Sequence, residues 1–393
     1  MNSRADGRRL PAATDAPTVL QVAWFAAPHG GGFIASLVAL GERLAQAGWR
    51  QVLALPRAAR ERDWFGELAA GPAAIQLLST PSAFALAREV AAIAGRERAC
   101  ILHAHFVPST IPVWLASRWL RARARPCTAV WHLHSPHAVA PSLPRRVRDL
   151  VKYGLIARDV HTIVVSEGGL LTMTERGLSA HRAHVITNGV DVSRLERPAV
   201  RTRMAVREAF TVAADDRVIL LSGWHPRFKG ADLAIDAAAR VAERRGDVRL
   251  VVIGTEALRA YVDARFPGGI PPWLRIAAPT DDFAGYLCAA DLFLSASRVE
   301  GFPYAIAEAM AAGLPVVASD IRGMEWTRAA PGVVRFPSEN VEALTQAIER
   351  VLAWSPPERE TMTAANRKLV YENHTVGEWA SRVFALYEGI AAS

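Results

Sequence analysis

Residues 291–319 have the sequence D-L-F-L-S-A-S-R-V-E-G-F-P-Y-A-I-A-E-A-M-A-A-G-L-P-V-V-A-S. The apolar run 291–295 predicts a buried strand, and the polar segment 297–302 predicts a loop. Pro303 suits the first turn of a helix, because its fixed φ is helical and its missing N–H would have no partner there. The helix is expected to end at Gly313, and the valines that follow it predict a second buried strand. The order is therefore strand, loop, helix and strand.

The junction between this loop and this helix predicts an anion site. The amides of Gly301, Phe302 and the first helical turn are expected to be free donors, and with the helix dipole they suit a phosphate or a diphosphate. Glu300 precedes the helix and Glu308 lies within it. Carboxylates at these two places suit hydrogen bonds from sugar hydroxyls on either side of a diphosphate. The spacing E-x7-E alone also fits an ordinary solvated helix, and the longer motif around it makes the pattern specific.

That longer motif is S-x-x-E-G-F-P-x-x-x-x-E-A-M-A-x-G-x-P-V-V-A-S, at 297–319. It resembles the donor-binding signature of the retaining glycosyltransferases of family 4, which have the GT-B fold. In that family the first Glu of the pair approaches the donor sugar, and the second holds the nucleotide ribose. The resemblance implies a catalytic role for Glu300 and donor binding by Glu308, with further donor contacts from Gly301, Phe302 and Pro303.

Length and composition narrow the class of protein. At 393 residues the chain is too long for one ordinary core, so two domains are expected. The net charge of +8 and the pI of about 9.9 favour an anionic partner, which includes a nucleotide, a nucleic acid or an anionic membrane surface. The three cysteines have no metal-binding spacing and are interpreted as small core residues in a reducing, cytoplasmic compartment.

The first uncharged stretch of the chain, residues 16–41, is not predicted to cross a membrane. Pro28, His29 and three glycines interrupt it in the middle. A secretory signal is not expected either, because a long polar segment that contains Asp6 and Asp15 precedes the apolar part. Residues 1–17 are interpreted as a disordered tail.

Strands and helices alternate through the N-terminal half. Strands are predicted at 19–24, 50–55, 73–78, 99–104, 128–133 and 161–165. This alternation predicts a parallel α/β sheet, which binds ligands at the carboxyl ends of its strands. Glycines after the first strand allow a ligand to approach the backbone closely, although the dinucleotide pattern G-x-G-x-x-G is absent. Family 4 enzymes are similar here, with a Gly-Gly loop facing the donor phosphates and acceptor, which implies donor binding by Gly31 and Gly32.

Four histidines end two neighbouring predicted strands: His103, His105, His132 and His134. Zinc is the alternative use for such a group, but no carboxylate or Cys completes a ligand set with recognisable spacing, so no metal is assigned. In the family, a His at the end of the later strand lies under the donor sugar. His134 matches that position and is expected to be catalytic, with His132 as the alternative.

Two clusters of basic residues each have two interpretations. Residues 143–158 predict a helix with arginines and a lysine on one face and apolar residues on another. It suits anionic lipid headgroups, and equally a solvated basic face. The arginines at 118–125 have the same two interpretations. Neither cluster has the aromatic residues expected for binding of single-stranded nucleic acid, so no nucleic-acid partner is predicted.

A second strand–helix series begins at 217, after a polar segment that is interpreted as a linker. The segment S-G-W-H-P-R-F-K-G, at 222–230, resembles the G-R-L-x-x-x-K-G segment of the family, whose Arg and Lys hold the donor diphosphate. Gly223, Lys229 and Gly230 match, whereas Trp224 stands at the Arg position. Two alternatives are open: Arg227 supplies the missing charge from a shifted place, or Lys229 acts with the helix amides alone. Asp281 and Asp282 are adjacent and are interpreted as helix-capping residues, not as a metal-binding D-x-D.

The resemblance covers roughly residues 19–390 and implies a domain plan. The expected parts are an N-terminal acceptor-binding Rossmann-like domain at 18–195, a linker at 196–215, and a C-terminal nucleotide-sugar-binding Rossmann-like domain at 216–375. Residues 376–393 are expected to form a helix that crosses back to the first domain, as the last helix of the GT-B fold does.

The function implied is a retaining, metal-independent hexosyltransferase without a cofactor. A nucleotide-diphosphate sugar would be the donor, and a sugar or a lipid-linked acceptor would supply the hydroxyl. Bacterial cell-surface polysaccharide or glycolipid synthesis, in the cytoplasm or at the inner face of the plasma membrane, is the expected setting. Two alternatives stay open, a nucleotide-sugar epimerase on the same fold and a non-catalytic scaffold, and the second is favoured by Trp224.

Overall fold

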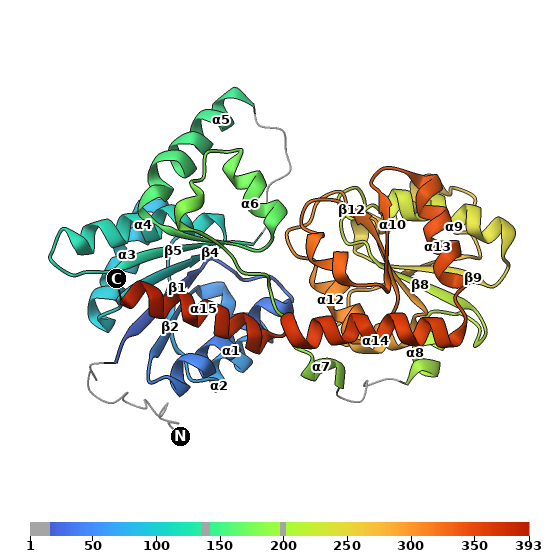
Figure 1. The fold of residues 1–393 in the computed structure, drawn as a ribbon, viewed down its shortest axis with the longest axis horizontal. Helices are drawn as coiled ribbons and strands as arrows, with labels where there is room; N and C mark the ends of the chain where they lie inside the picture. The colour runs from blue at the N-terminus through green and yellow to red at the C-terminus, as the bar shows by residue number, and fades with distance from the viewer. Residues whose placement is uncertain (1–15, 135–141, 197–201, 393) are drawn as a thin grey trace, which may run out of the picture.

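The structure is a computed structural model that describes residues 16–134, 142–196 and 202–392. Two parallel β-sheets, each covered by helices on both faces, lie next to each other along the long axis of the molecule (Figure 1). The tail expected at 1–17 lies outside the described residues, apart from Ala16 and Pro17.

The first sheet has seven parallel strands in the order β3-β2-β1-β4-β5-β6-β7. Apolar runs bounded by turns form these strands, as the sequence predicts. Their bounds are β1 Thr18–Ala23, β2 Arg50–Pro56, β3 Ala74–Leu78, β4 Ile101–His105, β5 Thr128–Leu133, β6 His161–Val164 and β7 Ala183–Val185.

Helices α3 and α4 cover one face of this sheet, while α1 and the C-terminal α15 pack against each other on the opposite face. The helices are α1 Gly31–Gln46, α2 Phe65–Ala70, α3 Ala83–Glu97, α4 Val107–Arg121, α5 Leu143–Asp149, α6 Glu167–Thr174, α7 Ser193–Glu196 and α15 Val376–Ala391. The last helix therefore lies on the first sheet, although the preceding helix belongs to the second.

The second sheet has six parallel strands in the order β10-β9-β8-β11-β12-β13. The strands are β8 Arg217–Ser222, β9 Val248–Ile253, β10 Leu274–Ala277, β11 Leu292–Ser295, β12 Val316–Asp320 and β13 Val333–Pro337. Its helices are α8 Arg203–Ala209, α9 Ala231–Arg244, α10 Glu256–Arg265, α11 Phe283–Ala289, α12 Tyr304–Ala311, α13 Val341–Leu352 and α14 Pro356–Asn373. The expected α/β fold with two Rossmann-like halves is confirmed.

Three local expectations need correction. The segment 196–215 is not a plain linker, because α8 packs in the core of the second half and buried Arg207 donates to Asp291. The basic helix expected at 143–158 is α-helical only to Asp149, and then continues as a π-helix and a 3₁₀ turn. Pro303 is the N-cap of α12, with ψ 103°, and not a residue of its first turn.

The order of the strands determines where ligands can bind. In the first sheet the order reverses between β1 and β4, and in the second it reverses between β8 and β11. Ligands of open α/β sheets bind outside the carboxyl ends of the strands at such switch points. The loops that follow these four strands all contribute to one cavity between the two halves.

Candidate functional site

The cavity between the two halves has a volume of ≈ 1330 Å³. The first half contributes the glycine loop before α1 and the end of β5, and the second contributes the loops after β8 and β11 together with the start of α12. Ligand pockets occur preferentially at such domain interfaces and switch points. Nine of the site residues predicted from the sequence line this cavity: Gly31, Gly32, His134, Lys229, Glu300, Gly301, Phe302, Pro303 and Glu308.

An ion pair lies at the centre of the second half's side of the cavity. Lys229 Nζ is 2.7 Å from Oε1 of Glu300, and the Ser297 hydroxyl donates to the same oxygen at 2.7 Å. Both charged side chains are mostly buried, with 20% and 10% of their surface exposed. A buried pair of this kind is costly to break on one side alone, because the remaining charge loses its partner. An anionic ligand that binds Lys229 therefore competes with Glu300.

The two loops that carry this pair are joined by their backbones and by one arginine. Gly230 has φ +66°, and a Cβ added there would lie 1.9 Å from the carbonyl oxygen of Ala296, so this position requires glycine. The amide of Arg298 donates to the carbonyl of Phe228 at 2.9 Å, and the guanidinium makes two hydrogen bonds to Asp232. These contacts hold Lys229 and Glu300 at a fixed separation.

The start of α12 faces the cavity. Gly301, Phe302 and Pro303 are buried there, and the first amides of a helix lack partners within the helix. Glu308 lies one turn further along. Burial raises the pKa of its carboxyl to about 7; Arg194 opposes this shift, and Asp191 adds to it. This carboxyl is therefore poised to change charge near neutral pH.

Only some of the residues that the sequence singled out in the loop after β8 line the cavity. Trp224 lines the cavity with 55% of its surface exposed, and Lys229 Nζ lies 5.6 Å from the centre of its ring. Arg227 points away: its side chain is 75% exposed and lies 3.7 Å from Asp232. Among the described residues that line the cavity, neither Arg227 nor Gly223 is present, and Gly223 instead packs on Val252 of β9. In this conformation Lys229 alone of the loop's cations faces the cavity.

The glycine loop of the first half touches the second half directly. A Cβ added at Gly32 would lie 2.4 Å from the ring of Tyr304, so the absence of a side chain allows α1 to approach α12. His29 Nδ1 lies 3.0 Å from Oδ1 of Asp281, which bridges the two halves on the far side of the loop. Asp282 caps α11 by accepting a hydrogen bond from the amide of Gly285, as the sequence predicts.

The four histidines gather on the face of the first sheet that α15 covers. Successive side chains of a strand alternate between faces, so residues two apart share a face, and the register pairs His105 of β4 with His132 of β5. The ring centres of His103 and His105 lie 4.2 Å apart, and those of His132 and His134 lie 4.1 Å apart. Burial lowers the pKa of His134 to about 3 and lowers those of the other three well below the usual value.

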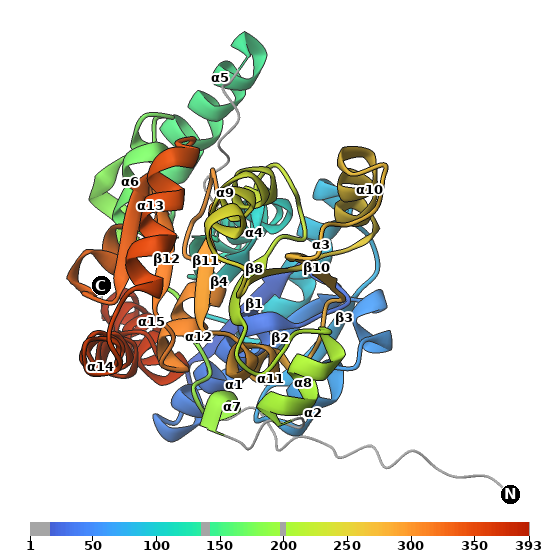
Figure 2. The ribbon, with the colours of Figure 1, turned by 90° about the vertical axis from the view of Figure 1, so that its right-hand side faces the viewer.

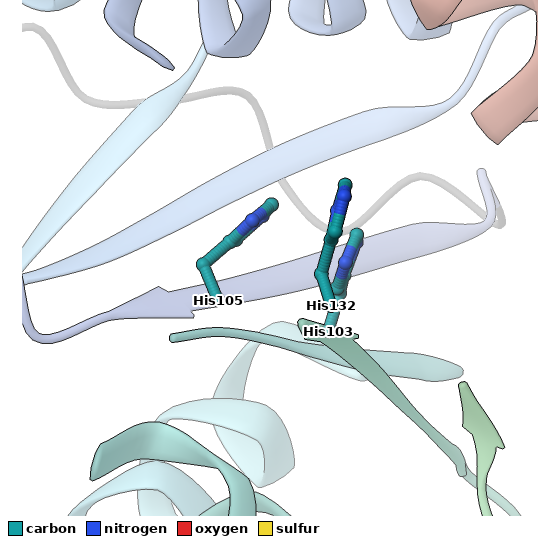
Figure 3. Close-up of side chains that lie close together, drawn as sticks. All are labelled: His103, His105 and His132. Carbon is teal, nitrogen blue, oxygen red and sulfur yellow. The ribbon is translucent and has the colours of Figure 1, made fainter. Parts of the chain in front are cut away.

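Three of these histidines are close enough to suggest a metal centre. His103, His105 and His132 each place a ring nitrogen within 4.8 Å of the others, and Figure 3 shows the side chains projecting side by side from neighbouring strands. Both nitrogens of His105, however, already have hydrogen-bond partners, Gln21 and His134. His103 is also engaged, because its Nδ1 is hydrogen-bonded to the hydroxyl of Tyr387. His103 and His105 are better described as members of hydrogen-bonded chains than as metal ligands, and both ring nitrogens of His132 lack a partner among the described residues.

Several residues of the site are not predicted from the sequence. Gln21 of β1 and Gln51 of β2 are buried and bond to each other next to the histidines, and Tyr387 reaches them from α15. A polar residue inside each of two otherwise buried strands is the signal that could have found the glutamines. Tyr304 and Arg194 line the cavity without any pattern of their own in the sequence.

Both halves of the chain match known protein families. Residues 30–194 match the model described as "Glycosyltransferase Family 4", and residues 215–353 match the model described as "Glycosyl transferases group 1". The two matches lie on either side of residues 195–214 and contain most of the residues that line the cavity.

Similar curated proteins have names of the same class. The chain is 32% identical to the D-inositol 3-phosphate glycosyltransferase of Jonesia denitrificans over 157 residues. These residues make up 36% of this chain and 36% of that protein. The chain is 25% identical over 227 residues to the lipopolysaccharide core biosynthesis mannosyltransferase LpsB of Rhizobium meliloti, 52% of this chain and 62% of that one. The match thus spans less than two thirds of either relative's length.

Solved structures share the architecture over nearly the full chain. A glycosyltransferase from Rickettsia africae has a TM-score of 0.81 at 17% identity and covers 96% of this chain and 99% of its own. An Anabaena protein, HepE, solved in complex with UDP, has a TM-score of 0.77 at 18% identity and covers 95% and 100%. With both halves matched by glycosyltransferase models on this architecture, the chain belongs to the family 4 type of glycosyltransferases with the GT-B fold.

Proposed function

We propose that the protein is a retaining glycosyltransferase that moves a hexose from a nucleotide-diphosphate sugar to an acceptor hydroxyl. The observation that carries this proposal is the pair of Lys229 and Glu300 beside the N-terminus of α12, in a cavity lined by both halves. A cation and free helix amides suit a diphosphate, and the two glutamates at either end suit the hydroxyls of the sugar and of the ribose. The UDP-glucose complex solved for the Anabaena protein supports a donor of this class.

In the proposed reaction the donor diphosphate binds Lys229 and the amides at the start of α12. The bond between the anomeric carbon and the diphosphate oxygen breaks, and the acceptor oxygen forms its bond to that carbon from the same face. The proton of the acceptor hydroxyl moves to the departing phosphate oxygen, so the nucleoside diphosphate leaves with it. Lys229 stabilises the charge that develops on the leaving group, and Glu300 stabilises the positive charge that develops on the sugar.

Retention without a covalent intermediate is proposed because of what faces the sugar's side of the cavity. A double displacement needs a carboxylate beneath the anomeric carbon. At the end of β5, where the family resemblance places the sugar, the first half offers His134, which is neutral because burial lowers its pKa to about 3. The carboxylates with which this half lines the cavity, Asp63, Glu67 and Asp191, lie in other segments. Product analysis by NMR tests retention, because the anomeric configuration of the donor must persist in the product. A covalent glycosyl-enzyme found by mass spectrometry would contradict the absence of an intermediate, because a double displacement also retains the configuration.

The first experiment is a screen of nucleotide sugars for thermal stabilisation, because a ligand that binds only the folded protein raises its apparent stability. The best donor is then incubated with acceptors and with no acceptor. Transfer that persists in EDTA is expected, because Lys229 and the helix amides are proposed to take the place of a metal ion. Loss of transfer in EDTA with recovery on adding Mn²⁺ or Mg²⁺ would contradict the metal-independent mechanism.

The same assay separates the two alternatives. An epimerase converts the donor sugar without any acceptor present, whereas a transferase requires one. A non-catalytic scaffold binds the donor by calorimetry and transfers it to none of the acceptors. The scaffold has a specific observation in its favour, because Trp224 replaces the second cation of the phosphate loop and Arg227 points away from the cavity.

We further propose that the acceptor is presented at an anionic membrane surface, as expected for lipid-linked cell-surface glycans. Helix α5 extends away from the rest of the first half in both views (Figures 1 and 2). Along α5 and the π-helix after it, five apolar side chains are 45–75% exposed: Leu143, Val147, Leu150, Val151 and Leu155. Among the helices of the described residues, none has the length and hydropathy of a membrane span.

Charge supports lipid as the partner of this surface. Arg145, Arg146 and Arg148 lie on α5 among the apolar residues, whereas Asp149 is buried beside Arg176. The exposed part is therefore cationic and apolar at once, which suits the boundary between anionic headgroups and acyl chains. The arginines at 118–125 are less available, because Arg121 and Arg118 pair with Asp159.

Vesicle sedimentation tests this proposal. The protein is expected to bind vesicles that contain phosphatidylglycerol and not vesicles of phosphatidylcholine alone. Replacing Leu150 and Leu155 with Ser should abolish binding, while the control Met204→Ser, which changes a side chain 78% exposed on the second half, should leave it intact. Equal binding by the double variant and the control would show that this surface does not contact lipid.

A further inference from the structure

We propose that a chain of buried amide and imidazole groups fixes which ring nitrogen of His134 carries the proton, so that His134 offers an N–H donor, and not a lone pair, to the cavity. Gln51, Gln21 and His105 are positioning residues in this chain, and His134 is the group that meets the ligand. That the ligand atom is a sugar oxygen rests on the proposed function. The position of the proton does not depend on it.

The chain begins at a backbone carbonyl, which can only accept hydrogen bonds. Gln51 Nε2 lies 3.0 Å from the carbonyl oxygen of Leu37, and this contact orients the Gln51 amide. The same nitrogen lies 2.5 Å from Oε1 of Gln21 and donates to it. The Gln21 amide is therefore oriented in turn, with its nitrogen on the side of the histidines.

The next hydrogen bond determines which ring nitrogen of His105 carries the proton. Gln21 Nε2 lies 3.3 Å from Nε2 of His105. An amide NH₂ group donates and does not accept, so Nε2 of His105 must be the acceptor. His105 is fully buried, and burial lowers its pKa well below the usual value, so the ring is neutral and has a single proton. That proton is on Nδ1.

The last link reaches the cavity. Nδ1 of His105 lies 3.2 Å from Nε2 of His134 and donates to it. His134 is neutral as well, because burial lowers its pKa to about 3, so its own proton is on Nδ1. Nδ1 of His134 has no hydrogen-bond partner among the described residues, and the side chain lines the cavity. A ligand there meets a donor.

This tautomer determines what His134 can do. An Nδ1–H group can donate to a hydroxyl oxygen of the donor sugar, but it cannot take a proton from an acceptor hydroxyl. His134 thus positions the sugar and is not a general base. A side branch through Tyr387 does not reach His134: the Tyr387 hydroxyl accepts a hydrogen bond from Gln21 Nε2 at 3.5 Å and is hydrogen-bonded to Nδ1 of His103.

The direct test is long-range ¹⁵N–¹H NMR of the ¹⁵N-labelled, unliganded protein, which distinguishes protonated from bare ring nitrogens. The signals of His134 are those missing in both His134→Asn and His134→Gln. We expect a protonated Nδ1 and a bare Nε2 for His134 in the wild type at neutral pH. A protonated Nε2 would overturn the proposal, whether or not the protein has transferase activity.

Two pairs of variants extend the test to function. Asn places an amide where Nδ1 of His lies, and Gln places it nearer Nε2, so His134→Asn should retain more kcat/KM than His134→Gln. Gln21→Met should give a mixture of His134 tautomers and lower kcat/KM by about two- to tenfold, the effect of one weakened hydrogen bond. Tyr387→Phe, equally buried beside Gln21, should leave the tautomer pure. Equal tautomer mixtures in both variants, or a pure Nδ1–H tautomer in Gln21→Met, would contradict the chain.

Discussion

Two parts of the cavity wall are built from opposite kinds of side chain, the part around Lys229 in the second half and the part around His134 in the first, although both lie at the switch point of a parallel sheet. The second half presents ions: Lys229 and Glu300 form a buried pair, and Arg298 binds Asp232 behind them. Around His134 the first half presents neutral rings, because the ring centre of Phe106 lies 4.5 Å from that of His134 and His132 stacks on it. The charged residues with which the first half lines the cavity, Asp63, Glu67, Asp191 and Arg194, come from other segments. The same backbone topology therefore carries two different electrostatic designs.

The difference indicates a division of labour. Ions act over several ångströms in a partly buried site, and they suit a diphosphate that must be held and then released as a charged leaving group. Neutral donors discriminate by direction and distance, and they suit hydroxyl groups of a sugar. If this comparison is right, changes on the charged side should have large effects on transfer, and changes on the neutral side should have small ones.

The largest effect is expected from Glu300→Gln, which keeps the shape of the side chain and removes its charge. Positive charge develops on the sugar as its bond to phosphate breaks, so kcat should fall by about 10²–10³. Binding of the nucleoside diphosphate should persist or tighten, because Lys229 loses the carboxylate that now occupies it. Transfer assays and calorimetry measure the two parameters, and a fully active Glu300→Gln enzyme would refute the assigned role.

A smaller effect is expected from Lys229→Ala, which should weaken binding of the donor by about 10- to 100-fold, the value of a hydrogen bond to a charged group. Arg227→Ala is the matched control, since it removes a cation of the same loop that points away from the cavity. Its donor affinity should change less than about twofold. Similar losses in both variants would mean that the loop rearranges to bring Arg227 to the phosphates.

The next effect concerns pH. Burial raises the pKa of Glu308 to about 7, so the carboxylate that would accept from ribose hydroxyls forms only as pH rises through 7. Donor affinity should increase by about tenfold between pH 6 and 8. Because the folded pKa lies above the usual value of 4.5, the stability contributed by this group is present below pH 4.5 and lost as pH rises through 7.

Glu308→Gln is the control for this prediction. It should bind the donor more weakly at pH 8, raise KM more than it lowers kcat, and show no dependence on pH in this range. Titration calorimetry of donor binding at several pH values measures the effect. A dependence on pH that persists in Glu308→Gln would assign the titration to another group.

The smallest effect is expected on the neutral side, at His132. Both of its ring nitrogens are buried without partners among the described residues. Replacement by Leu, which has a similar volume, should therefore stabilise the fold by about 1 kcal/mol, because a buried unpaired polar group is removed. Thermal unfolding measures this change, and kcat/KM should stay within about twofold. A large loss of activity would instead make His132 the residue that meets the sugar.

Sequence reasoning predicted the core strands closely, because each is an uninterrupted apolar run between turn residues. β5 has the predicted bounds, 128–133, and β2 at 50–56 is one residue longer than predicted. It failed where tertiary contacts override local pattern. The polar segment after 196 looks like a linker, yet α8 is held by the buried ion pair of Arg207 with Asp291, which lies 84 residues away.

The sequence by itself determined the elements, the two halves and the motif around Glu300 and Glu308, because short-range pattern and spacing are properties of the chain. The tertiary structure decided which charges face each other. Lys229 and Glu300 are 71 residues apart and meet because β8 and β11 are neighbours, whereas Arg227, two residues from Lys229, turns outward. It also decided the chemistry of His134, since that histidine's proton is fixed by side chains from β1, β2 and β4 that no spacing in the sequence brings together.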